Sequence, residues 1–165
     1  MAAADVNHDG VPDIITGAGP GGGPEVRVFD GAHLALAGPS GDIIRDFFAF
    51  APTYTGGVNV TGADVNGDGF ADLVTAAATN SSEVRVFSGL NLALLEDYFA
   101  SNGPLPGGVH LGALPDTDTD VGQEIITGST NSPLVNVLDG TDHSVLDGFY
   151  AYNINFTGGV YVGGI

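Results

Sequence analysis

Two stretches of the sequence place oxygen-bearing side chains at alternating positions around a glycine. ADVNHDGVPD spans residues 4–13 and ADVNGDGFAD spans residues 63–72, and a divergent version, PDTDTDVGQE, spans residues 115–124. Two carboxylates about 4 Å apart repel each other by roughly 4 kcal/mol at an effective dielectric constant of about 20. Either a bound cation offsets this repulsion or the loops stay open to water.

The spacing of these side chains suits calcium, which takes six to eight oxygen ligands in a flexible geometry, better than magnesium, which demands a strict octahedron. Side chains at loop positions 1, 3 and 5 can point inward, and glycine at position 6 permits the sharp turn. Position 7 offers a carbonyl oxygen, and position 9 adds a carboxylate. The sequence therefore predicts Ca²⁺ ligands in three loops: Asp5, Asn7, Asp9, Val11 and Asp13; Asp64, Asn66, Asp68, Phe70 and Asp72; and Asp116, Asp118, Asp120, Gly122 and Glu124.

The loops differ from an EF-hand, and the third loop differs from the other two. An EF-hand closes with a glutamate at position 12 and is flanked by helices, whereas here strand-like sequences flank each loop and that glutamate is missing. In the third loop Val121 stands where the glycine is expected. The prediction of calcium therefore rests mainly on the first two loops.

Composition excludes several classes of function. Twenty acidic residues against three arginines give a net charge of −17, which argues against nucleic acid as a partner because that affinity comes from basic side chains. There is no cysteine, so a disulfide framework and a thiolate zinc site are excluded. No apolar run is long enough to cross a membrane, and we expect no secretory leader within this chain.

Four markers recur in the same order along the chain and indicate a repeat. After each acidic loop come EVRVFDG, EVRVFSG or LVNVLDG, then DFFAF, DYFAS or GFYAY, and finally GGVNV, GGVHL or GGVYV. Each unit contains four short strand patterns joined by turn residues. Repeated units of four antiparallel strands are typical of β-propeller blades, and a β-solenoid is the alternative. We expect an all-β chain with blades over about 1–57, 58–108 and 109–157, and an inner strand over 158–165 donated to the next blade.

ADVNGDGFADLV, followed by the VRVF and GGV markers, resembles the FG-GAP repeat, the blade of integrin α-subunit propellers and of many secreted bacterial proteins. The resemblance covers essentially the whole chain. It implies a calcium ion in the loop between the first two strands of a blade, and an extracellular, adhesive or ligand-binding context. We expect a protein without enzymatic activity.

Three blades are too few to close a propeller ring. The first unit begins at MAAADVN without the GGV marker, and the sequence finishes with an additional copy, GGVYVGGI. We therefore expect a homodimer with six blades, in which this additional strand supplies the inner strand missing from the first unit of the other copy. The alternative is a segment of a longer array of blades.

Other patterns leave two further functions open. The aromatic residues Phe47, Phe48, Tyr98, Phe99, Phe149 and Tyr150 recur at one repeat position, which favours packing between blades and leaves a glycan-binding lectin as an alternative. A propeller from a secreted polysaccharide-processing enzyme would need acids outside the loops. Asp30 and Asp139 recur there, but Ser88 replaces them in the middle unit. GAGPGG at 17–22 reads as a hairpin loop, since a strand follows it where a nucleotide-binding loop needs a helix.

Overall fold

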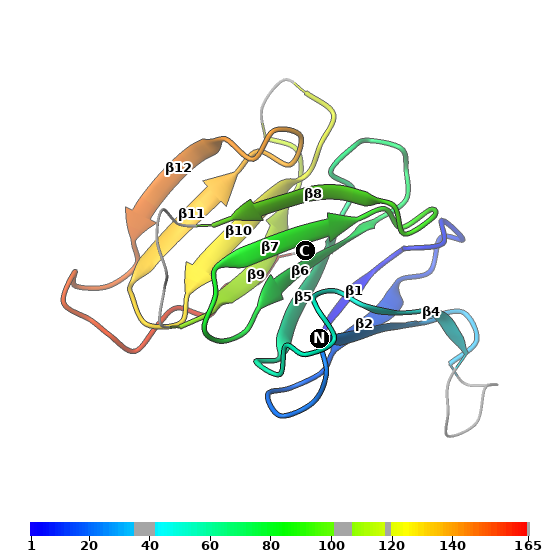
Figure 1. Ribbon diagram of the computed structural model, residues 1–165. Helices are drawn as coiled ribbons and strands as arrows, with labels where there is room; N and C mark the ends of the chain where they lie inside the picture. The colour runs from blue at the N-terminus through cyan, green and yellow to red at the C-terminus, as the bar shows by residue number, and fades with distance from the viewer. Residues whose placement is uncertain (35–41, 101–106, 118–119, 165) are drawn as a thin grey trace.

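The computed structural model describes residues 1–34, 42–100, 107–117 and 120–164. This part of the chain folds into twelve strands and contains no helix, and therefore none long and apolar enough to cross a membrane. The strands form three four-stranded antiparallel sheets, each built from four consecutive strands. Figure 1 shows the three sheets side by side in chain order, as the blades of an incomplete propeller would lie.

Each sheet, called a blade below, follows the order of its strands in the chain. The first blade consists of β1 (Ala2–Ala4), β2 (Asp13–Gly17), β3 (Glu25–Phe29) and β4 (Ile43–Phe48). The second consists of β5 (Val58–Ala63), β6 (Asp72–Ala77), β7 (Glu83–Phe87) and β8 (Leu94–Phe99). The third consists of β9 (Val109–Leu114), β10 (Glu124–Ser129), β11 (Leu134–Leu138) and β12 (Val145–Tyr150).

Alternating side chains give each third strand two different faces. In β7, Val84 and Val86 are buried whereas Arg85 and Phe87 are only partly buried, which is the alternation that the period of two predicts. The second strands of the middle and third blades behave differently, because all six residues of β6 and all six of β10 are buried.

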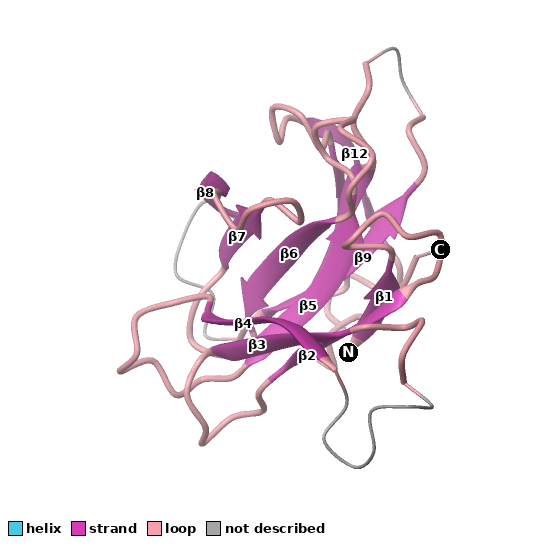
Figure 2. Ribbon diagram, turned by 90° about the vertical axis from the view of Figure 1, so that its right-hand side faces the viewer, coloured by secondary structure: helices cyan, strands magenta, loops and turns pink. Residues whose placement is uncertain are grey.

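The hydrophobic core lies between the blades. One cluster joins Val6, Ile15 and Phe50 of the first blade and its loops to Val58 and Leu73 of the second. A second cluster joins residues of β5–β7 to residues of β9–β11. Figure 2, turned by 90°, shows the faces of neighbouring blades opposite each other. Because the apolar side chains of one blade are covered by the next, the blades stabilise one another.

One expectation from the sequence can be judged directly. The expectation that the first unit has no inner strand of its own is wrong, because β1 pairs with Asp13–Ile15 of β2. However, β1 contributes three residues, whereas β5 and β9 each pair over six positions.

Residues 158–164 lie against the third blade without forming a strand with any described residue. The Val160 N–H donates to the Ser129 carbonyl at 2.8 Å. The equivalent bond joins Val58 N–H to the Ala18 carbonyl at 2.9 Å, where β5 meets the first blade. Residues 158–164 therefore occupy the place of the first strand of a further blade, and their donation to that blade stays a prediction.

Candidate functional site

The acidic loops occupy the same place in all three blades. Residues 5–12 connect β1 to β2, and residues 64–71 connect β5 to β6. The third segment, residues 115–123, connects β9 to β10, but residues 118 and 119, and with them the predicted ligand Asp118, lie outside the described residues. Each loop joins the first two strands of its blade, as the sequence predicted.

In the first loop, acidic and amide side chains accept hydrogen bonds from the loop backbone. The Asp5 carboxylate accepts bonds from the N–H groups of Asp9 (3.1 Å) and Gly10 (2.8 Å). Asn7 Oδ1 accepts a bond from Asp9 N–H at 3.0 Å, and Asp9 Oδ1 accepts one from Val11 N–H at 2.8 Å. These four bonds curl the backbone around the side chains at positions 1, 3 and 5.

The second loop repeats this set of bonds. The Asp64 carboxylate accepts from the N–H groups of Asp68 (3.1 Å) and Gly69 (2.9 Å). Asn66 Oδ1 accepts from Asp68 N–H at 2.9 Å, and Asp68 Oδ1 accepts from Phe70 N–H at 2.9 Å. The residues at position 6, Gly10 and Gly69, have φ of 86° and 89°, a conformation that favours glycine.

The carboxylates at position 9, Asp13 and Asp72, are fully buried and hold separate parts of the blade together. Burial raises the pKa of Asp72 to about 6, against the opposing effect of two backbone N–H groups, and the nearby carboxylates of Asp68 and Asp64 raise it further. Asp72 accepts from Val65 N–H and Gly89 N–H, both at 3.1 Å, and Asp13 accepts from Val6 N–H at 3.0 Å and Gly31 N–H at 2.9 Å.

This bridge to the turn after the third strand was not predicted from the sequence. A signal for it is present, because a glycine closes each third-strand marker at a fixed place, as Gly31, Gly89 and Gly140. A Cβ at Gly89 would meet the Ala71 carbonyl oxygen at 2.2 Å. The glycine therefore lets the turn approach the end of the acidic loop closely.

Loops of neighbouring blades contact each other. The Ala71 N–H donates to the Asp5 carbonyl at 3.0 Å, and the Gln123 N–H donates to the Asp64 carbonyl at 2.8 Å. The His8 ring lies 5.2 Å from the Phe70 ring and bonds to the Gly69 carbonyl. The order of one loop is therefore coupled to the order of the next.

In the third loop, the described residues repeat one bond of the first two loops, from the N–H at position 7 to the carboxylate at position 5, and add bonds from threonine side chains. The N–H and hydroxyl groups of Thr117 both donate to Glu124 Oε1, at 2.5 and 2.6 Å. The Thr141 hydroxyl donates to Asp120 Oδ2 at 2.6 Å, and Gly122 N–H donates to Asp120 Oδ1 at 2.9 Å. Two predicted ligands of this loop therefore already bond to threonine side chains.

The donor chemistry of the first two loops fits calcium, although a coordination shell is not formed. Carboxylate, amide and carbonyl oxygens are the ligands that calcium prefers, and a carboxylate that accepts one or two N–H bonds keeps further lone pairs. In the described part of the chain, however, no group of three or more His, Asp or Glu side chains converges as a metal site. In both loops the acids face their own backbone.

The recurring acids outside the loops cap turns. Asp30 Oδ1 accepts from the N–H groups of Ala32 and His33, at 2.8 and 3.2 Å. Asp139 Oδ1 accepts from the N–H groups of Thr141 and Asp142, at 2.6 and 3.1 Å. The hydrogen bond with His33 lowers the pKa of Asp30 and raises that of His33. These contacts give the two acids a structural role.

The blade junctions contain further polar groups that the sequence pattern did not reveal. At the second junction the His143 ring stacks on Tyr98 at 4.6 Å, and His143 Nδ1 lies 3.3 Å from Glu96 Oε2. Burial raises the pKa of Glu96. At the first junction the Arg85 guanidinium lies 5.4 Å from the centre of the Phe50 ring, beside a cavity of about 680 Å³ that Tyr54 and Asn80 also line. Neither cluster recurs in all three repeats, so periodicity gave no signal for it.

The comparison with protein families matches the segments that contain the first two acidic loops. The FG-GAP repeat model matches residues 1–32, which contain β1–β3, and residues 55–87, which contain β5–β7. No curated protein sequence matches the chain.

One similar solved structure is the crystal structure of BBS1N in complex with ARL6DN, soaked with mercury. It matches with a TM-score of 0.53 at 9% identity, over 94% of this chain and 44% of that chain. This chain thus spans less than half the length of the solved one, and the likeness concerns the fold alone. Both matched segments contain the same loop and the same strand order, so residues 1–32 and 55–87 are identified as FG-GAP repeats, as the sequence predicted for these two units.

Proposed function

We propose that this chain is a calcium-stabilised, non-enzymatic β-propeller module that binds ligands or mediates adhesion outside the cell. The observation that carries the proposal is the shared geometry of residues 5–13 and 64–72, in which the same four hydrogen bonds shape both loops. FG-GAP repeats, found here in two units, are typical of extracellular propellers. Secretion and adhesion follow from this family context.

In this proposal the first two loops each hold one calcium ion. The ligands are the side chains at positions 1, 3, 5 and 9 and the backbone carbonyl at position 7. The ion supplies positive charge where three carboxylates lie within nine residues of the chain. The third loop is left out, because threonine side chains already bond to Glu124 and Asp120.

Calorimetric titration of the metal-free chain with Ca²⁺ tests this assignment, and we expect two ions bound per chain. Asp9→Asn together with Asp68→Asn should abolish binding, because each change removes a charge while an amide oxygen can still accept the N–H bond of Val11 or Phe70. Asp147→Asn, which removes an exposed carboxylate outside the loops, is the matched control and should bind two ions. A chain that takes up no calcium would refute the assignment.

A glycan-binding lectin is the second candidate, favoured by one observation. Phe48, Phe99 and Tyr150 recur at the same position of their blades and are 53%, 66% and 54% exposed, so aromatic surface for stacking is open in each blade. Phe47 and Tyr98, in contrast, pack on Phe87 and His143 of the next blade, as the packing interpretation predicted.

Glycan-array binding tests the lectin candidate. We expect a positive signal that falls when Phe48, Phe99 and Tyr150 are replaced together by serine. The signal should survive when Leu94, an apolar residue that is 52% exposed, is replaced by serine. An array without signal at high protein concentration would argue against this candidate and leave the calcium proposal untouched.

A further inference from the structure

One face of the third blade is exposed although its sequence is that of a packed face. Phe149, Tyr152 and Phe156 are 48%, 58% and 41% exposed, and Ala151 is exposed as well. These four residues are called the free face below. Among the described residues no strand lies over them, so three aromatic side chains and Ala151 meet solvent.

The junction between the first and second blades shows what normally covers this face. The rings of Phe47 and Phe87 lie 4.9 Å apart. Arg85 Nη1 donates to the Ala49 carbonyl at 3.1 Å, and its guanidinium lies 5.4 Å from the centre of the Phe50 ring. Ala49 and Phe50 are 0% and 6% exposed in consequence. An arginine and a phenylalanine of the following blade thus complete the packing.

The free face repeats that arrangement residue by residue. FFAFAPTYTGGV at 47–58 aligns without a gap on FYAYNINFTGGV at 149–160, which places Tyr152 at the position of Phe50. The rings of Tyr152 and Phe156 lie 5.0 Å apart, and those of Phe50 and Tyr54 lie 5.4 Å apart. The third blade therefore presents the same surface as the first, prepared for a following blade.

The first blade carries the strand that would fit. EVRVF in β3 is identical to EVRVF in β7. Arg27 lies 2.6 Å from Glu25 and 3.3 Å from Asp46, and Arg85 makes the equivalent pairs with Glu83 and Asp97 at 2.7 and 3.3 Å. The Arg27 side chain is 43% exposed against 29% for Arg85, which lies against Ala49 and Phe50 of the preceding blade.

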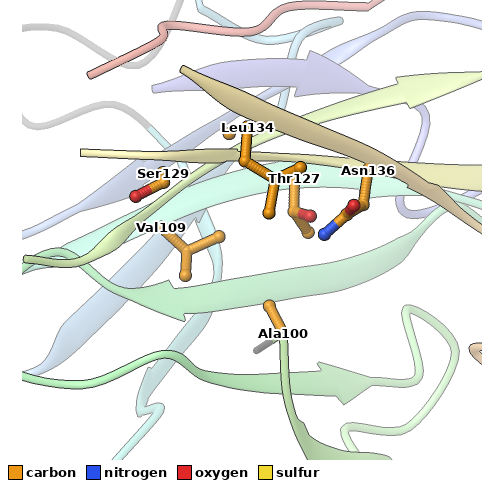
Figure 3. Close-up of a pocket in the computed structure, with 7 residues that line it drawn as sticks. Ala100, Val109, Thr127, Ser129, Leu134 and Asn136 are labelled. Carbon is orange, nitrogen blue, oxygen red and sulfur yellow. The ribbon is translucent and has the colours of Figure 1, made fainter. Parts of the chain in front are cut away.

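At the second junction both the aromatic residue and the arginine are replaced, which indicates that the two occur together. There the sequence has Ser101 at the position of Phe50 and Asn136 at the position of Arg85. Figure 3 shows Asn136 and Thr127 across from Ala100, around a small cavity of about 20 Å³. Tyr152 restores the aromatic residue, so the matching blade should carry arginine, and β3 is the remaining strand with arginine at that position.

The first blade and the segment that follows the third blade are also complementary in their inner strands. β5 pairs with six residues of β6, whereas β1 pairs with only three residues of β2, so Thr16 and Gly17 have no first-strand partner among the described residues. In the repeat alignment, Tyr161 and Val162 stand at the positions that pair with this part of β2. They already lie at the place of a first strand, beside β9 and β10.

We propose that the free face of the third blade binds the first blade of a second copy of this chain, with Arg27 of the partner subunit on Tyr152 and on the Ala151 carbonyl. In the same junction the partner's Phe29 packs on Phe149, and residues 160–162 extend the inner edge of the partner's first blade. Each copy carries both surfaces, so two copies related by a two-fold axis close a ring of six blades with two identical junctions.

Sedimentation equilibrium of the chain with calcium tests this, in about 0.15 M salt so that repulsion between two acidic copies is screened. We expect twice the monomer mass of 16.6 kDa at micromolar concentration. Phe149→Ser and Arg27→Glu should each raise the dissociation constant about thirty-fold or more, as for central interface residues. Tyr150→Ser is the matched control, because Phe99, at the same position, stays 66% exposed beside a neighbouring blade. Its mass should equal that of the unchanged chain.

Cross-linking identifies the junction independently of mass. The chain has no cysteine, so a mixture of Phe29→Cys and Phe149→Cys chains should form a heterodimer with a short bis-maleimide, whereas Phe29→Cys mixed with Tyr150→Cys should not. A monomer at all concentrations would overturn the proposal. A dimer that neither Phe149→Ser nor Arg27→Glu weakens, or that links through residue 150 instead of 149, would overturn it as well.

Discussion

Saturating calcium should raise the melting temperature of the chain by about 10 °C or more, and a chelator should reverse the rise. Each ion held at a hundred times its dissociation constant adds about 2.7 kcal/mol to the free energy of unfolding. Two ions therefore add about 5 kcal/mol, and 1 kcal/mol moves the midpoint of a chain of this size by about 2–4 °C. Differential scanning calorimetry with calcium and with EDTA measures the difference.

The physical reason is the charge density of the loops. Asp64, Asp68 and Asp72 lie within nine residues, and the first two of these carboxylates raise the pKa of the third. Without a cation their mutual repulsion opposes the folded loop, and a dication converts this repulsion into attraction. Because Gln123 N–H bonds to the Asp64 carbonyl and Ala71 N–H bonds to the Asp5 carbonyl, order in one loop should stabilise the adjoining blade.

Matched variants separate this effect from a general response to salt. Asp9→Asn with Asp68→Asn should remove the calcium-dependent part of the melting temperature, and Asp147→Asn should retain it. Magnesium at the same concentration should stabilise the chain less, because its octahedral geometry is stricter. If the melting temperature is the same with EDTA as with calcium, calcium has no structural role in these loops.

The repeat made most of the fold predictable from the sequence. Hydrophobic alternation in EVRVF and the fixed order of four markers predicted four strands in each unit, and the middle unit has them as β5–β8. The first strand of the first blade was missed, because AAA at 2–4 carries no strand signal of its own. It pairs with Asp13–Ile15 since the neighbouring blade covers it, and such tertiary packing overrides local propensity.

The sequence predicted which residues form the acidic loops better than it predicted how their side chains are arranged. Alternating acids and glycine identified the loops, and the structure gives the first two identical hydrogen bonds. The burial of Asp13 and Asp72 could not be read from the pattern, because their partners at Gly31 and Gly89 lie 17 or 18 residues away. The bond between Thr141 and Asp120, which are 21 residues apart, was hidden for the same reason.

Leu73→Ala should lower the free energy of unfolding by about 2–5 kcal/mol, as buried leucine-to-alanine changes do. Leu73 is 0% exposed and belongs to the cluster that joins the first two blades. Chemical denaturation followed by far-ultraviolet circular dichroism gives the value, and Leu94→Ala, at a leucine of the same blade that is 52% exposed, is the control with an expected change below about 0.5 kcal/mol.

The shape of the Leu73→Ala transition carries as much information as its midpoint. Since the core lies between blades, a cavity at the first junction weakens both blades that form it, and the described blades should unfold in one transition. Ile15, Val26 and Val28 of the first blade are buried in the cluster that this blade shares with the second. A biphasic curve in which the first blade melts separately, while Leu73→Ala leaves the second phase unchanged, would mean that each blade is stabilised by its own hydrogen bonds rather than by its neighbour.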